Sequence, residues 1–135
     1  MEAIQETIQV ETRDGANAFL PGEVVEGTVS WQLAIPASRA ELRLFWYTEG
    51  KGDQDLKIVE TVAFANPERQ DRRGFSVRLP EGPFSFSGKL ISLLWALEVV
   101  LDPGSRAERL VLTVSPTRRE ILLPTTSEVS GASPR

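Results

Sequence analysis

Apolar and polar side chains alternate along most of this chain, which is the pattern of β-strands that bury one face. Between Val24 and Leu33 every second residue is small or apolar, and the residues between them are polar. The same period of two returns at Leu42–Trp46, Phe75–Leu79 and Leu110–Val114. The alternation predicts about eight strands, near residues 4–11, 24–34, 40–49, 56–65, 74–79, 88–102, 107–115 and 118–123.

Residues suited to tight turns separate the predicted strands. Pro21-Gly22 and Asp102-Pro103-Gly104 are of this kind. Many short strands at this spacing predict an all-β fold, an immunoglobulin-like antiparallel β-sandwich. One segment differs, because Asn66-Pro67-Glu68 offers a helix N-cap followed by a first-turn proline. We therefore expect at most a short surface helix near 67–73.

The length and composition fit a single folded unit. A chain of 135 residues, of which 41% are hydrophobic and 25% charged, is of ordinary globular character and has room for one core. The last residues are polar and lack periodic apolar positions. We therefore predict one sandwich domain over residues 1–123 and a flexible C-terminal tail over 124–135.

Composition also removes several classes of function. Asp and Glu outnumber Lys and Arg by 19 to 15, so the chain lacks the basic surface that nucleic-acid binding requires. The chain has no cysteine and no histidine, which excludes catalytic triads, thiol nucleophiles and the usual zinc ligand sets. We expect no catalytic residue, no cofactor and no metal site.

The start of the chain, Met1 to Glu6, is acidic and polar, whereas a secretory signal needs a basic segment and then an apolar run. No stretch approaches the roughly 18 apolar residues of a membrane span. The expectation is a cytoplasmic domain.

Two motifs about fifty residues apart stand out. The first is FLPGEVVEGTV, residues 19–29, and the second is LPEGPFSFSG, residues 79–88, which leads into the apolar strand around Trp95. They resemble the Pro-Gly-Glu hairpin entry and the Pro-x-Ser-aromatic-x-Gly turn of the arrestin-like family. The resemblance covers about residues 4–115 and implies one arrestin-type sandwich, related to those of the sporulation-control and retromer proteins. Since those proteins carry two such sandwiches in tandem, the resemblance implies that this one pairs with itself or with a protein partner.

The sequence departs from the family in two places. Receptor-binding arrestins carry adjacent lysines on their first strand, whereas residues 4–11 here contain Glu6 and Glu11 and no basic residue, so phosphate sensing is not carried over. The amphipathic helix that covers one sheet in arrestins would fall at 66–73, which is short and polar. That sheet is therefore expected to be uncovered.

The strand from Gly88 to Asp102 is apolar on both faces, so it must be covered twice. If its Trp95 face joins the core, the other face aligns with aromatic residues on the strand at 40–49. An exposed apolar patch of this kind marks an interface, and we expect a homodimer or protein-partner interface at Phe45, Tyr47, Leu90, Leu94 and Val100. The competing expectation is that the segment Ile121–Leu123 folds over this face.

Other partner-binding features are weaker. Phe84 and Phe86 form a loop tip that plugs the end of the sandwich or contacts a partner. An open sheet edge can accept an added strand, but the sequence does not say which edge is open. The arginines at 69, 72 and 73 are interleaved with acids, which favours a solvated loop.

Two further functions stay open. Phe45, Trp46 and Tyr47 are candidates for stacking on sugar rings in a carbohydrate-binding sandwich, although such modules are mostly secreted. A carboxylate-dependent hydrolase needs a pair of acids, and only Glu60 and Glu98 lie among apolar neighbours. Of the two, the sugar-binding module is the stronger alternative to a protein-interaction or scaffold role.

Overall fold

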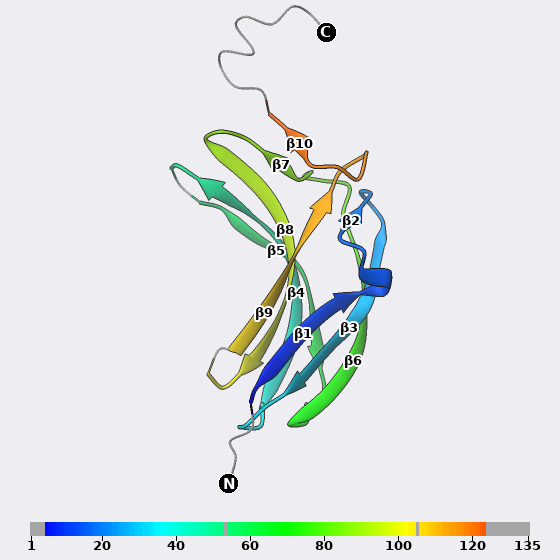
Figure 1. Ribbon diagram of the computed structural model, residues 1–135, viewed down its shortest axis with the longest axis vertical. Helices are drawn as coiled ribbons and strands as arrows, with labels where there is room; N and C mark the ends of the chain where they lie inside the picture. The colour runs from blue at the N-terminus through cyan, green and yellow to red at the C-terminus, as the bar shows by residue number, and fades with distance from the viewer. Residues whose placement is uncertain (1–4, 53, 105, 124–135) are drawn as a thin grey trace, which may run out of the picture.

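The computed structural model describes residues 5–52, 54–104 and 106–123, and it is a sandwich of two sheets whose long strands all pair antiparallel (Figure 1). The small sheet has the strand order β1-β3-β6. Its members are β1 (Thr7–Thr12), β3 (Val24–Gln32) and β6 (Gln70–Arg78).

The large sheet is built around β8 (Ile91–Asp102). One edge of β8 pairs with β4 (Arg39–Gly50), which pairs in turn with β5 (Leu56–Phe64). The other edge pairs with β9 (Arg106–Val114) and, nearer the start of β8, with the two-residue β7 (Phe86–Ser87). Two short parallel strands complete the sheet: β2 (Ala18–Phe19) beside β9, and β10 (Ile121–Leu122) beside β7.

The core lies between the two sheets and follows the alternation of the sequence. Val25, Val29 and Trp31 point inward from β3, and Leu42 and Leu44 point inward from β4. The inward face of β8 supplies Leu93, Trp95, Leu97, Val99 and Leu101, all of them buried. Trp95 lies at the centre and donates a hydrogen bond from its indole nitrogen to the Pro83 carbonyl oxygen at 2.8 Å. The predicted all-β sandwich, and the predicted inward face of β8, are confirmed.

The helix signal at Asn66-Pro67-Glu68 does not lead to a helix, because residues 70–73 belong to a strand. Asn66 has φ of 50° and ends β5 in a turn, and β6 begins at Gln70. The Asp71 carboxylate accepts the backbone N–H of Glu68 and so closes the loop before β6. The structure also has a short 3-10 turn at Arg13–Gly15. The predicted tail at 124–135 lies outside the described residues, and the domain boundary at residue 123 stays a prediction.

The two sequence motifs meet in space, and their contacts explain their composition. The N–H of Gly22 donates to the Pro80 carbonyl, and the N–H of Leu79 donates to the Glu23 carbonyl. Gly22 has φ of +79°, a conformation that favours glycine. The motifs therefore join the start of β3 to the end of β6.

The second motif also anchors β9, because the buried Ser85 hydroxyl accepts the N–H of Val114 at 2.9 Å. In the first motif, Gly27 faces the ring of Phe75 and the carbonyl of Glu11, where a side chain would have no room. The close approach of the Phe75 ring and the Glu11 carbonyl accounts for a glycine at position 27.

Candidate functional site

The outer face of the large sheet carries most of the residues predicted for partner binding. Tyr47 lies opposite Leu94, and Phe45 lies opposite Ala96, in the register of β4 and β8. Directly opposite residues of antiparallel strands share a face. Phe45 and Tyr47 therefore share the face turned away from the core with Leu94, and Val100 lies on the same face opposite Glu41.

Phe45 is only 2% exposed although it points away from the core. The guanidinium carbon of Arg109 lies 4.9 Å from the centroid of the Phe45 ring and 4.9 Å from that of Tyr47. The two rings are themselves 5.7 Å apart. A cation placed over aromatic faces is attracted by their electron density. Arg109 of β9 thus covers Phe45 and holds the ring pair in place.

Apolar side chains extend this cluster to both sides. Ile58 of β5 lies opposite Phe45, and Leu56 lies opposite Tyr47. On the other side, Val111 of β9 lies opposite Ala96. Leu56, Ile58 and Val111 are 58%, 46% and 44% exposed. We call the set the aromatic patch, and it consists of Phe45, Tyr47, Leu56, Ile58, Leu94 and Val111.

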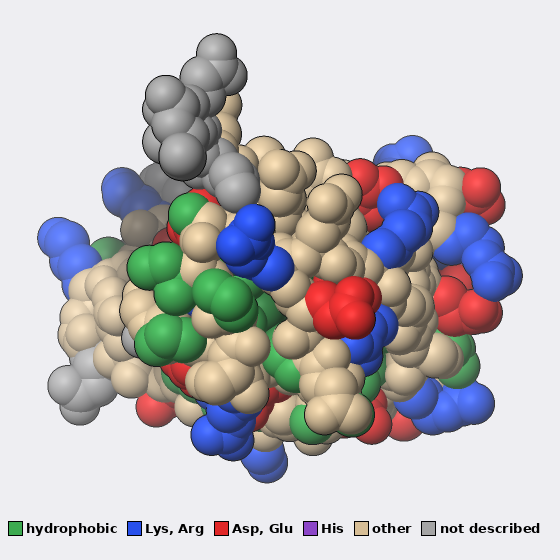
Figure 2. Space-filling model, turned by 90° about the horizontal axis from the view of Figure 1, so that it is seen from below, with side chains coloured by type: hydrophobic (Ala, Val, Ile, Leu, Met, Phe, Trp, Pro, Cys, Tyr) green, Lys and Arg blue, Asp and Glu red, His purple; other side chains and the backbone are tan. Residues whose placement is uncertain are grey.

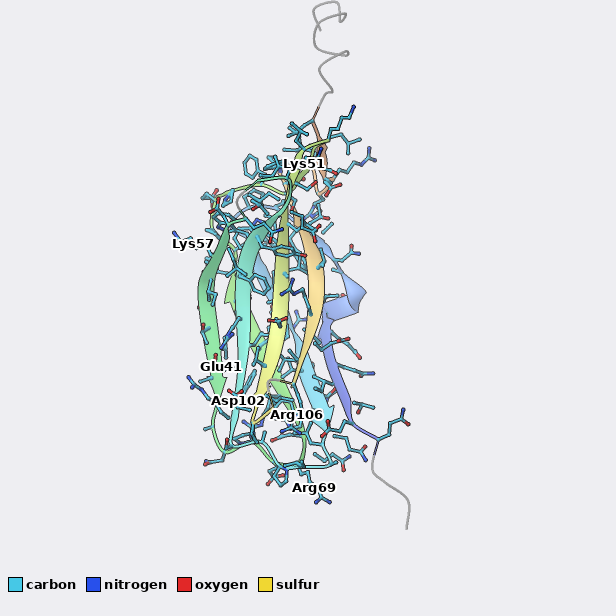
Figure 3. The ribbon with its side chains drawn as sticks, turned by 90° about the vertical axis from the view of Figure 1, so that its left-hand side faces the viewer. Glu41, Lys51, Lys57, Arg69, Asp102 and Arg106 are labelled. Carbon is cyan, nitrogen blue, oxygen red and sulfur yellow. The ribbon has the colours of Figure 1, made fainter. Side chains whose placement is uncertain are left out.

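Charged residues occupy the rest of the same face. The buried Glu41 carboxylate lies 2.8 Å from the Arg39 guanidinium and 3.0 Å from that of Arg43. Glu98 lies 3.3 Å from Arg109. These pairs neutralise each acid locally, and Figure 3 shows Glu41 well below the level of Lys57 on this side of the molecule. The outer face is thus divided into an ion-paired half and an apolar half.

The side of the molecule formed by the large sheet is also the more apolar in the space-filling view. Figure 2 shows apolar side chains gathered on that side, at the left, and a higher density of charged groups toward the other side. The outer face of the small sheet is polar in every strand, with Gln9 in β1, Ser30 in β3 and Arg72 in β6. A shallow hollow there is lined by Thr7, Ser30, Trp31, Gln32, Gln70, Asp71 and Arg72.

The C-terminal segment does not lie on the aromatic patch in the described residues. Ile121 and Leu122 form β10, which extends the sheet beside β7, and Leu123 donates its N–H to the Ser87 carbonyl at 2.8 Å. All three side chains are exposed. Residues 121–123 therefore extend the sheet beside β7 and do not cover the outer face of β8, contrary to the competing expectation.

The remaining predicted partner-binding residues lie away from the patch. Phe86 packs against the core, as expected for a plug of the sandwich end, whereas Phe84 is partly exposed in the loop before it. Leu90 is 63% exposed in the turn before β8, where its carbonyl accepts the N–H of Lys51. Val100 lies in the ion-paired half of the face. Of the predicted partner-binding residues, Phe45, Tyr47 and Leu94 thus lie together on one surface. Leu90, Val100, Phe84 and Phe86 lie elsewhere.

Sequence reasoning missed Arg109, Val111, Leu56 and Ile58 as members of this surface. The available signal was the alternation of β9 and of β5, in which Leu110 and Leu112 alternate with Arg109 and Val111. Alternation does not predict the register between β8 and β9. That register places Val111 beside Ala96 and Arg109 above the rings of Phe45 and Tyr47.

The structure gives little support to sugar stacking or to acid catalysis. Trp46 packs against the core, on the opposite face from Phe45 and Tyr47, and Arg109 occupies the exposed side of these two rings. Glu98 is ion-paired on the outer face, whereas Glu60 lies opposite the core residue Leu44. The part of the chain that the structure describes has no group of three or more acidic side chains placed to hold a metal ion.

Elsewhere, two carboxylates are held by local hydrogen bonds. The Arg73 guanidinium beside Asp71 lowers the pKa of that carboxyl below its ordinary value, and the N–H groups of Glu68 and Arg72 add to this. The backbone N–H of Ala34 similarly lowers the pKa of Glu6, which also pairs with Arg106. In both cases the shift comes from contacts that stabilise loops. The arginine cluster at 69, 72 and 73 therefore includes one arginine already engaged by Asp71.

No family model matches the chain, and no curated protein is similar to it. Among solved structures, the chain is similar to the sporulation control protein Spo0M of Bacillus subtilis, with a TM-score of 0.60 and 19% identity over 82% of this chain and 49% of that one. The CARDB domain of the PF1109 protein from Pyrococcus furiosus gives a TM-score of 0.41 at 8% identity, over 82% of this chain and 93% of that one.

The described residues contain no helix with the length and hydrophobicity to cross a membrane. The chain spans about half the length of the sporulation control protein. Since the identity is low, this similarity concerns the fold alone. The chain has an arrestin-like β-sandwich fold of the type seen in that protein.

Proposed function

We propose that this domain is a non-enzymatic protein-interaction module, and that the aromatic patch is its partner-binding surface. The observation that carries the proposal is the contrast between the patch and the rest of the surface. Exposed Leu56, Ile58 and Val111 adjoin a preformed ring pair in the middle of a sheet face, where a solvated sheet normally presents polar side chains.

The chemistry of the patch defines the partner that fits it. Rings fixed by Arg109 lose little side-chain freedom on binding, which favours a hot spot built from aromatic and arginine side chains. The Arg109 guanidinium already contacts Glu98 and is still 40% exposed as a side chain. The partner expected here is a protein surface that presents apolar side chains together with a carboxylate.

The lack of histidine and cysteine supports the non-enzymatic part of the proposal, because it removes the commonest nucleophiles and general bases. The cytoplasmic location stays a prediction.

A site-specific cross-linking experiment tests the proposal. A photoreactive amino acid is introduced at Tyr47 in one variant and at Ser76, on the outer face of the small sheet, in a matched control. Irradiation in cells of the native organism is expected to yield a discrete protein adduct from position 47 only, and Leu94→Asp is expected to abolish it. Equal adducts from both positions, or an adduct that survives Leu94→Asp, would contradict the proposal.

A further inference from the structure

β5 is the outermost strand at one edge of the large sheet. Its Leu56 and Ile58 belong to the aromatic patch, whereas its Lys57 and Glu60 lie outside the patch. In the described part of the chain it pairs with β4 alone. All six residues from Leu56 to Thr61 are exposed, so neither face of this half of the strand is covered. Figure 3 shows Lys57 at this margin of the sheet. An unpaired strand edge presents main-chain donors and acceptors to any chain that can align with it.

A β-bulge in the middle of β5 changes which of its side chains share a face. Lys57 lies opposite Trp46 and Glu60 lies opposite Leu44, with the register shift between them at Val59. Trp46 and Leu44 both point toward the core side of β4. Lys57 and Glu60 therefore lie on one face although they are three residues apart, which in a regular strand would place them on opposite faces.

The bulge makes the strand self-complementary about its centre. If two copies of β5 pair antiparallel around a two-fold axis between Ile58 and Val59, Lys57 lies opposite the partner subunit's Glu60, and Glu60 lies opposite the partner subunit's Lys57. The same register sets Leu56 opposite the partner subunit's Thr61. Leu56 and Thr61 share the outer face, since they lie opposite Tyr47 and Arg43. The two facing pairs Lys57/Glu60 and Leu56/Thr61 thus each share a face.

The charges of this strand are available for such pairing. Within residues 5–52, 54–104 and 106–123, neither Lys57 nor Glu60 takes part in an ion pair. Opposite charges directly across two strands stabilise the pair, and like charges oppose it. A lysine and a bulge commonly protect a strand edge from pairing. Here the spacing of Lys57 and Glu60 gives the lysine a matching carboxylate in a second copy.

The corresponding edge of the small sheet lacks this match. β6 carries Arg72, Arg73 and Arg78, and its acid Asp71 is already engaged by Arg73 at 2.9 Å. Self-pairing there would concentrate positive charge. We propose that the domain forms a two-fold symmetric homodimer by antiparallel pairing of β5 with β5 of a second copy. A two-fold axis perpendicular to the sheet would set the two aromatic patches on the same side of one continuous sheet.

Charge reversal provides the test, with mass measured by light scattering after size exclusion. Wild type is expected to dimerise. In Lys57→Glu or in Glu60→Lys, residues 57 and 60 carry like charges, so the dimer would contain two repulsive pairs across the two-fold axis. Each variant is expected to weaken the dimer about tenfold, because both pairs change from attractive to repulsive. An equimolar mixture of the two variants restores complementary pairs, so it is expected to form a heterodimer. The double variant Lys57→Glu/Glu60→Lys is expected to dimerise like wild type.

Lys89→Glu, the same charge change in the turn before β8, serves as the matched control and is expected to leave the dimer unchanged. Unchanged circular dichroism spectra verify that all variants fold. A wild type that stays monomeric at every concentration, or a dimer equally strong in both single variants, would overturn the proposal. So would a failure of the mixed variants to associate. Failure of the dimer would leave the proposed role of the aromatic patch standing, because Lys57 and Glu60 lie on the opposite face of β5 from the patch residues Leu56 and Ile58.

Discussion

The outer faces of the two sheets arise from the same alternation but have opposite character. On the small sheet, the outward residues of β1 and β3 other than Val24 are hydroxyl, amide or carboxylate side chains, such as Gln9, Thr28 and Ser30. On the large sheet, the outward residues of β4 and β8 include Phe45 and Leu94. An antiparallel sheet with one solvated face is normally polar on that face. The small sheet follows this rule, and the large sheet departs from it over half of its face.

The difference between the two outer faces shows which surface residues are not explained by the requirements of folding alone. Either face would permit the same core, because the core is filled from the inward side by residues such as Val29 and Leu97. Apolar outward residues add exposed surface that favours association. The polar face of the small sheet is explained by solvation, and the proposed function attributes the aromatic patch to binding.

The largest expected effect comes from Phe45→Ala. Although Phe45 lies on an outer face, it is as buried as a core residue, so its loss should lower the free energy of unfolding by about 3 kcal/mol. Thr28→Ala, on the outer face of the small sheet, should change it by less than about 0.5 kcal/mol. Urea denaturation measures both. Equal effects would show that the faces do not differ in packing.

Gly27→Ala and Gly74→Ala compare the inward and outward faces of the small sheet itself. A methyl group at Gly27 would overlap the Glu11 carbonyl and the Phe75 ring, whereas one at Gly74 would meet only the Gly27 carbonyl oxygen at 3.9 Å. We expect Gly27→Ala to destabilise by about 2 kcal/mol through overpacking and Gly74→Ala to be nearly neutral. Thermal unfolding checks the pair, and a stable Gly27→Ala variant would refute this account of the motif glycine.

Arg109→Ala should have a smaller effect, because it removes a cation from above two rings and leaves Glu98 without its partner. The expected loss is about 1 kcal/mol. Arg109→Lys should recover part of it, and Arg72→Ala on the small sheet should cost less than about 0.5 kcal/mol. If denaturant unfolding gives Arg72→Ala and Arg109→Ala the same cost, the guanidinium does not fix the ring pair.

The smallest expected effect is the loss of stability at acidic pH that comes from protonation of Asp71. Because the folded pKa of Asp71 is below its ordinary value, its contribution to stability is present above about pH 4 and is lost as the pH falls through the folded pKa. Asp71→Asn should therefore lose less stability than wild type between neutral pH and that acidic window. Unfolding measured across the pH range provides the check, and parallel curves for the two proteins would contradict it.

The sequence predicted the sandwich because its alternating strands are long. The faces of β8 followed from period two alone, and with them the positions of Trp95 and Leu94. Local signals failed where tertiary pairing decides the outcome. Asn66-Pro67-Glu68 has good helix-start chemistry, yet the residues that would continue the helix, from Gln70 on, pair with β3 and form a strand.

The site was only partly predictable for a similar reason. Phe45, Tyr47 and Leu94 could be placed on one face from their own strands. The burial of Phe45 beneath Arg109 depends on a contact across the sheet between β4 and β9, which no local pattern encodes. The two-residue strands β2 and β7 were missed, and β10 is shorter than the strand predicted at 118–123, because segments so short are defined by their neighbours rather than by periodicity.

The central claim is that the outer face of the large sheet binds a partner and that of the small sheet does not. Its most direct test is an NMR spectrum of the isotope-labelled domain in an extract of the native organism, compared with buffer. The account predicts that the amide signals of Tyr47, Leu94 and Val111 broaden or shift, while those of Gln9, Ser30 and Ser76 stay unchanged. Perturbation confined to the small-sheet residues, or no perturbation at the aromatic patch, would contradict it.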